Sequence, residues 1–237
     1  MARKATTQKP VLVLKGGRTR EGARATASHT ASLAVEDSVF EGAVRQAGVL
    51  RIFAIDEFIR TLKGFLNMPL PRGGRIALVT YSGAQAIMSI DAAVEEGLQV
   101  ARFAEPTRER ISRVIATSSK AQNPVDLFPD MLARGFEKTA IEVLGALLED
   151  DGVDGIIIIS FAILGADPYR PIIDFLRERC HKPVFFTLLG TQKDMEISRA
   201  FLEENRVPCY EFPEMAVRVL ARMWRYARWR KEMSQNI

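Results

Sequence analysis

Hydrophobic residues follow two different periods along this chain. Short uninterrupted apolar runs alternate with longer stretches in which apolar residues recur every third or fourth position. The first pattern is typical of buried strands and the second of amphipathic helices. The chain therefore predicts strands that alternate with helices, which is the pattern of an α/β fold with a parallel sheet.

The alternation is most regular after residue 74. Strands are predicted at 75–81, 98–103, 154–161, 183–189 and 207–210. Helices are predicted at about 84–96, 106–115, 169–179, 193–205 and from 213 onward. Right-handed crossovers would cover both faces of the sheet, and the flavodoxin-like strand order 2-1-3-4-5 fits this size and number of elements.

The first part of the chain has too few strands for a second sheet of this kind. Strands are predicted at 11–14 and 49–53, and helices at about 30–47 (ended by Gly48) and 57–66. The segment 67–74 contains two prolines and two glycines, which favours a domain boundary. We therefore expect 1–72 to be the C-terminal part of one flavodoxin-like domain and 73–237 to be a complete second one.

Composition narrows the class of protein. The chain is 47% hydrophobic and 26% charged, as in soluble globular proteins, and it has neither a membrane-length apolar run nor a secretory signal. Cys180 and Cys209 are too few and too far apart for a disulfide framework or a zinc site. We expect a reducing, cytoplasmic location.

The net charge of +4 is mild, and part of the basic excess lies on one face of the last helix. This face is formed by Arg218, Arg222, Arg225 and Arg228. A solvated surface or a subunit contact is favoured over nucleic-acid binding, and no membrane interaction is expected.

His29 is the first candidate for chemistry. It is one of two histidines, it lies among small and hydroxyl residues, and Arg24 and other arginines precede it. Imidazole can act as a nucleophile and guanidinium can bind phosphoryl oxygens. The alternative is a helix N-cap at Ser28 with a solvated histidine behind it. These residues alone leave both interpretations open.

Two loops are further candidates. Ser82, Gly83 and Ala84 lie between a strand and a helix, where backbone amides can bind an anion, although such a turn needs small residues anyway. Asn123 and Asp126 lie in a proline-containing loop, where capping of turns is the default interpretation. The chain has no P-loop, dinucleotide fingerprint, metal-ligand spacing or nucleophile elbow.

Several blocks together resemble the ADP-forming acyl-CoA synthetases, the acetate–CoA ligase relatives of succinyl-CoA synthetase. The similarity runs from about Lys9 to Arg228. The blocks are KPVLVLKGGRT at 9–19, GARATASHTASLA at 22–34, QAGVLR at 46–51, VTYSGA at 79–84, NPVDL at 123–127, EDDGVDGI at 149–156 and FPEMAVRVLA at 212–221. The block that contains His29 is the specific one.

The resemblance implies a role for each candidate. His29 corresponds to the family's phosphohistidine, which relays a phosphoryl group between an acyl site and a nucleotide site. Ser82, Gly83 and Ala84 correspond to a helix N-terminus that helps to hold the phosphorylated histidine, although Gly83-Ala84-Gln85-Ala86 replaces the Gly-Gly-Pro-Gly run of many relatives. Supporting roles are assigned to Arg24, Ser28, Thr30, Asn123 and Asp126.

The resemblance also implies substrates and partners. The family joins a carboxylic acid to coenzyme A while ATP is cleaved to ADP and phosphate, with Mg²⁺ bound beside the nucleotide. The coenzyme A-binding domain, most of the histidine-bearing flavodoxin-like domain and the ATP-grasp (nucleotide-binding) domain would lie outside this chain, so we expect it to be inactive alone. A non-catalytic binding or assembly module derived from the family is the alternative. Homo-oligomer formation and the acyl substrate are left open.

Overall fold

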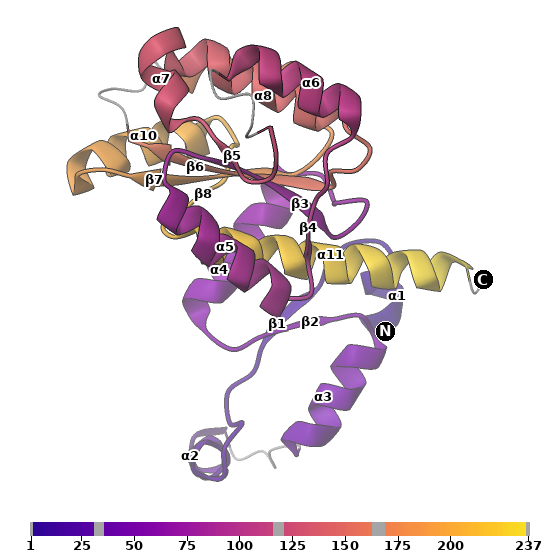
Figure 1. Ribbon diagram of the computed structural model, residues 1–237. Helices are drawn as coiled ribbons and strands as arrows, with labels where there is room; N and C mark the ends of the chain where they lie inside the picture. Colours follow the sequence, from indigo (N-terminus) through magenta and orange to yellow (C-terminus); the bar gives the residue numbers. More distant parts are fainter. Residues whose placement is uncertain (1, 31–35, 116–120, 163–168, 236–237) are drawn as a thin grey trace. The chain divides into compact units, whose positions relative to one another are not determined.

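The computed structural model describes residues 2–30, 36–115, 121–162 and 169–235, without the side chains of residues 29–30 and 131–133. The chain divides into two compact units (Figure 1). Unit 1 comprises residues 1–65 and 225–237, and unit 2 comprises residues 66–224. No helix in the described residues is long and apolar enough to span a bilayer.

Unit 2 is built on a parallel sheet. Its strands are β3 (Arg75–Thr80), β4 (Gln99–Val100), β5 (Val125–Asp126), β6 (Gly155–Phe161), β7 (Val184–Leu189) and β8 (Cys209–Tyr210). The order is β4-β3-β6-β7-β8, and the short β5 also pairs with β3. Counted from residue 75 without β5, which the sequence analysis did not predict, this is the expected order 2-1-3-4-5. The flavodoxin-like prediction is confirmed.

Helices lie on both faces of this sheet, as Figure 1 shows for α5 (Gly83–Glu95) on one face and α8 (Phe136–Glu149) on the other. The remaining helices of the unit are α6 (Glu105–Val114), α7 (Phe128–Arg134), α9 (Arg170–Arg179), α10 (Gln192–Glu204) and α11 (Pro213–Gln235), the last continuing into unit 1. Ala77 and Val79 of β3 belong to the core cluster that also contains Val143 and Leu144 of α8.

The sequence analysis missed α7 and α8. Nine residues of α8 are buried, including Val143, Leu144 and Leu147. A helix that is buried around most of its circumference has no clear polar stripe, so the period of 3.6 residues is hard to recognise. The expected strands and helices elsewhere in unit 2 are present, with ends shifted by a few residues.

Unit 1 contains a two-stranded parallel sheet. Its elements are α1 (Ala2–Thr6), β1 (Leu12–Leu14), α2 (Arg20–Thr30), α3 (Asp37–Gln46), β2 (Leu50–Ile52) and α4 (Ile55–Asn67). Residues of the C-terminal helix complete this unit, since the Tyr226 hydroxyl donates to the Thr6 carbonyl at 2.8 Å. The sequence-based limits, 1–72 and 73–237, assign residues 225–237 to the second domain instead. These limits stay a prediction.

The helix predicted at 30–47 is present from Asp37 to Gln46 as α3, and residues 31–35 of the predicted range lie outside the described residues, whereas the N-cap at Ser28 is wrong. Helix α2 begins at Arg20, where the Gly22 amide donates to the Thr19 hydroxyl at 3.1 Å, and Ser28 lies in its last turn. The Ser28 hydroxyl donates to the Ala25 carbonyl at 2.7 Å, as within a helix. The alanines of this segment favour helix.

The expected end of the following helix is confirmed. Gly48 has a φ of +70°, the left-handed conformation that ends many helices. The Val49 amide donates to the Val44 carbonyl at 2.9 Å, which completes a Schellman-type ending.

Candidate functional site

The histidine candidate lies on α2 of unit 1. His29 and Thr30 are the last two residues of this helix, and their side chains lie outside the described part of the structure. Arg24 and Ser28 are exposed on the same helix. Residues four positions apart share a helix face, so Arg24 and Ser28 lie on one side of α2. The backbone therefore groups these candidates on one exposed helix.

The anion-binding candidate lies at the beginning of α5 in unit 2. Ser82 is the N-cap residue, has an extended backbone and makes no side-chain cap hydrogen bond. Gly83 and Ala84 are exposed, and a side chain at Gly83 would point into open space. The first amides of a helix have no partner within it and carry a partial positive charge. The start of α5 is thus open to an anion such as phosphate.

Thr80 holds the backbone before this helix. Its hydroxyl donates to the Ser82 carbonyl at 2.7 Å and accepts from the Ser82 amide at 2.8 Å. The Ser82 carbonyl in turn accepts from the Ala86 amide at 3.1 Å, inside the first turn of α5. We missed this residue in the sequence, although a threonine two positions before an N-cap residue is a recognisable turn signal.

The proline-containing loop has a structural role in the described residues. The Asp126 carboxylate accepts from the Phe128 amide at 3.0 Å, which agrees with its interpretation as a turn cap. Asn123 does not cap a turn. Its amide group bonds to the backbone of Ile76, Leu78 and Ala101, so it holds neighbouring strands together.

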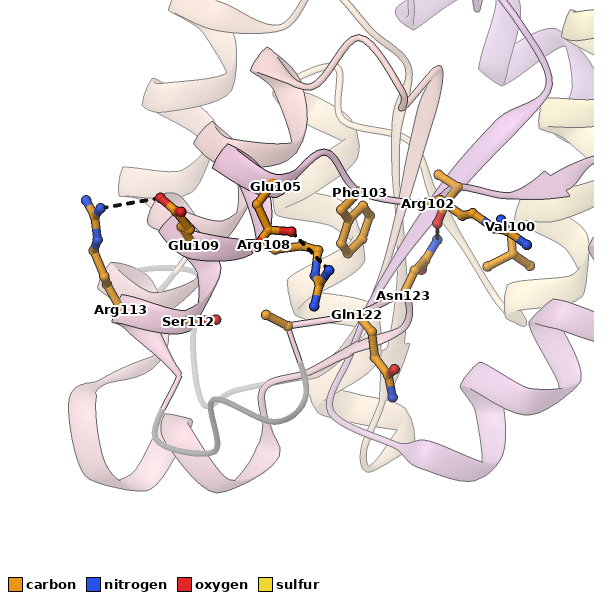
Figure 2. A pocket seen from close by; sticks show the side chains of 12 residues that line it. Val100, Arg102, Phe103, Glu105, Arg108, Glu109, Ser112, Arg113, Gln122 and Asn123 are labelled. Atoms are coloured by element: carbon orange, nitrogen blue, oxygen red, sulfur yellow. Dashed lines mark hydrogen bonds and ion pairs between the residues drawn. The ribbon is translucent and has the colours of Figure 1, made fainter.

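A cavity of about 1060 Å³ opens beside Asn123 in unit 2 (Figure 2). Described residues that line it come from β4, the segment between β4 and α6, α6 itself and the loop that precedes β5. The polar face of α6 supplies two ion pairs, Arg108 with Glu105 at 3.1 Å and Arg113 with Glu109 at 3.9 Å. Ser82, Gly83 and Ala84 are not among the described lining residues. The cavity and the start of α5 are therefore separate features.

Comparison with known proteins finds relatives that are similar to this chain over both units. Residues 1–65 match the family described as the succinyl-CoA ligase like flavodoxin domain. The chain is 34% identical over 228 residues to an ADP-forming acetate–CoA ligase II of Archaeoglobus fulgidus, covering 95% of this chain and 34% of that protein. It is 30% identical over 238 residues to the alpha subunit of ADP-forming acetate–CoA ligase I of Pyrococcus furiosus, covering 100% of this chain and 51% of that subunit.

A solved structure is similar over the whole chain. It is the acetyl-coenzyme A synthetase 1 of Candidatus Korarchaeum cryptofilum, described as dinucleotide-forming and in complex with phosphate and ADP. The identity is 26% and the TM-score 0.87, covering 100% of this chain and 51% of that one. The chain thus spans between about a third and a half of the length of these relatives.

Proposed function

Because the chain belongs to the ADP-forming acetyl-CoA synthetase family and corresponds to its alpha-subunit-like region, we propose that it is the phosphoryl-relay portion of such an enzyme. The whole enzyme would convert a carboxylic acid, coenzyme A and ATP into acyl-CoA, ADP and phosphate. The observation that carries the proposal is His29 at the end of α2, in the region that matches the succinyl-CoA ligase like flavodoxin domain.

In this role, a ring nitrogen of His29 attacks the γ-phosphorus of ATP, and ADP leaves with the bonding electrons of the broken P–O bond. The phosphohistidine then transfers the phosphoryl group to a carboxylate oxygen, which gives an acyl phosphate and regenerates the imidazole. The coenzyme A thiol, after losing its proton, attacks the acyl carbon and displaces phosphate. The open amides at the start of α5 would stabilise the phosphoryl oxygens without a metal.

The proposal requires parts that are not in this chain. A nucleotide-binding (ATP-grasp) subunit or domain would supply ATP and Mg²⁺, and a coenzyme A-binding domain would supply the thiol substrate. A relative from Pyrococcus furiosus is named as an alpha subunit, which supports a multi-subunit enzyme. Arg24, Ser28 and Thr30 would support the histidine from its own helix.

Phosphorylation of His29 tests the proposal directly. The chain is incubated with a nucleotide-binding partner subunit and ATP labelled at its γ-phosphate, and we expect an acid-labile, alkali-stable label on the chain. His29→Asn should abolish this label. His181→Asn is the matched control, because His181 is the other histidine and is exposed. The label on the chain should persist in this variant. A label that survives His29→Asn would contradict the assignment.

A second experiment tests the start of α5. Ala84→Glu places a carboxylate among the first amides, where it suits the helix but repels a phosphoryl group. We expect weaker labelling of His29 in this variant than in Ala84→Gln, which has nearly the same size and no charge. Equal labelling of the two variants would exclude α5 from the phosphate site.

The alternative, a binding or assembly module without phosphoryl transfer, is favoured by one observation. Gly83-Ala84-Gln85-Ala86 has fewer glycines than the corresponding run in many relatives, which reduces the room for phosphate. This alternative predicts stable binding to the partner subunit with no label on His29.

A further inference from the structure

The segment that carries His29 begins after β1, near Gly17, and ends before Asp37, the first residue of α3. One side chain joins these two points. The Lys15 ammonium lies 3.4 Å from the Gly17 carbonyl oxygen and 3.4 Å from a carboxylate oxygen of Asp37. The beginning and the end of the histidine-bearing segment are therefore held beside each other.

Arg51, in the middle of β2, holds Asp37 at the end of the histidine-bearing segment. Its side chain is only 5% exposed, and its two terminal nitrogens contact Asp37 at 2.5 Å and Glu41 at 2.7 Å. The hydrogen bond from Arg51 is the main cause that lowers the pKa of Asp37, and the same bond is the main cause that raises the pKa of Arg51. A nearly buried guanidinium is costly without such partners, so this pairing fixes α3 on the sheet.

Two aromatic rings restrict the position of the guanidinium. The Arg51 guanidinium lies 5.3 Å from the centre of the Phe40 ring and 5.0 Å from that of Phe53. The Lys15 ammonium also lies over Phe40, at 5.4 Å. Cation–π contacts of this kind favour one orientation of each cation. The two cations, the carboxylates and the rings thus form one connected cluster.

The cluster is connected to α2 through Gly17. This residue has a φ of +68°, and a Cβ atom there would lie 2.7 Å from the Thr26 hydroxyl oxygen. The backbone therefore passes very close to Thr26, which lies three residues before His29. A displacement of Gly17 would be transmitted to the turn of α2 that carries the histidine.

We infer that Arg51 is a positioning residue for His29: by holding Asp37 beside Lys15, it fixes both ends of the segment that carries the histidine. This inference rests on the proposed phosphoryl relay for its functional consequence. Nucleophile and phosphorus must meet in a narrow range of geometry, so small displacements of the histidine lower the rate strongly. Arg51 itself would not contact the phosphoryl group.

The structural half of this inference is tested without activity. Backbone ¹H–¹⁵N NOE values of residues 23–30 are measured in the full chain for Arg51→Ala and for the milder variant Asp37→Asn. Arg45→Ala is the matched control, because it removes the same charge from exposed α3 surface. We expect lower NOE values in the first two variants and no change in the control. Unchanged values in folded Arg51→Ala or Asp37→Asn would overturn the inference.

The functional half uses the labelling assay with the nucleotide-binding partner. Arg51→Ala should lower the labelling rate at saturating partner by roughly tenfold or more, while the half-saturating partner concentration stays the same. Arg51→Lys should restore part of the rate, because lysine can pair with one carboxylate. An unchanged rate would overturn the inference. No label on the wild-type chain would count against the proposed function, and the NOE values would then decide the positioning role.

Discussion

Asn123 takes the place of a strand partner for Leu78. Its side-chain oxygen accepts the Leu78 amide at 2.9 Å, and its side-chain nitrogen donates to the Ile76 carbonyl at 2.7 Å and the Ala101 carbonyl at 3.1 Å. Strand β3 pairs with β4 at residues 75–76 and with β5 at residues 79–80. The asparagine fills the gap between these two short partners.

Replacement of Asn123 by alanine should therefore destabilise unit 2. The variant removes three hydrogen bonds and leaves the Leu78 amide without this partner, while the Ile76 carbonyl keeps the Ala101 amide, so we expect a loss of about 2–4 kcal/mol. Chemical denaturation followed by far-UV circular dichroism measures the loss. Gln122→Ala is the control, because this neighbour is exposed, and its effect should stay within about 0.5 kcal/mol. Equal stability of the two variants would show that the bridge is unimportant.

Gly48 and Gly97 should respond differently to the same substitution. Both have positive φ, +70° and +78°, so alanine is strained at either position. A Cβ atom at Gly48 would lie 2.3 Å from the ring of Trp229, whereas Gly97 has open space. We expect Gly97→Ala to cost about 1 kcal/mol and Gly48→Ala about 2–4 kcal/mol, from strain together with overpacking. Denaturant unfolding followed by tryptophan fluorescence measures both, and similar losses would exclude the ring contact as the cause.

The long strands of the sheet could be predicted because each contains an apolar run, as in residues 156–159, and the number of alternating strands and helices predicted their order. The role of Asn123 could not be predicted, since its three partners come from β3 and from the residue that follows β4, which are distant in sequence. Polar side chains that bond to distant backbone have no periodic signal. Capping at Asp126 involves a residue two positions away and was within reach of local sequence rules.

The candidate site also combines features that local sequence patterns predict with features that they do not. Ser82 and Gly83 became candidates because a strand, a small-residue turn and a helix follow one another in the sequence. His29 became a candidate through its block, but its helix was misplaced, because alanine, serine and threonine occur in turns as well as helices. The pairing of Arg51 with Asp37 was missed, since a charged residue inside a short strand has no predictable partner.

The stability of unit 2 should fall in alkaline solution because of Cys180. Burial raises the pKa of this thiol from an ordinary value of 9.0 to about 11. The unfolded chain then loses the proton near pH 9 while the folded chain keeps it, so stability is lost as pH rises above 9. At pH 10, ionisation of this thiol in the unfolded chain lowers the free energy of unfolding by about 1.4 kcal/mol relative to neutral pH. Cys180→Ala should reduce the loss between pH 8 and 10, measured by urea unfolding, and an identical pH dependence would contradict this.

Arg206 occupies a position that suits glycine. Its φ is +61°, and it follows Asn205, the C-cap of α10. The Arg206 amide donates to the Glu203 carbonyl at 3.0 Å and the Val207 amide to the Leu202 carbonyl at 2.9 Å, as expected at a helix ending. Arg206→Gly keeps these bonds and removes the left-handed strain, at some cost in the entropy of the unfolded chain. We expect a net gain of about 0.5–1 kcal/mol in denaturant unfolding.

The control for this substitution is Arg206→Ala. Alanine removes the same exposed side chain but keeps the Cβ atom, so the backbone strain remains. We expect its stability to stay close to that of the wild-type chain, within about 0.5 kcal/mol. If alanine stabilises as much as glycine, the gain comes from loss of the arginine side chain rather than from relief of the left-handed backbone. If glycine gives no gain over alanine, this helix ending stores no strain.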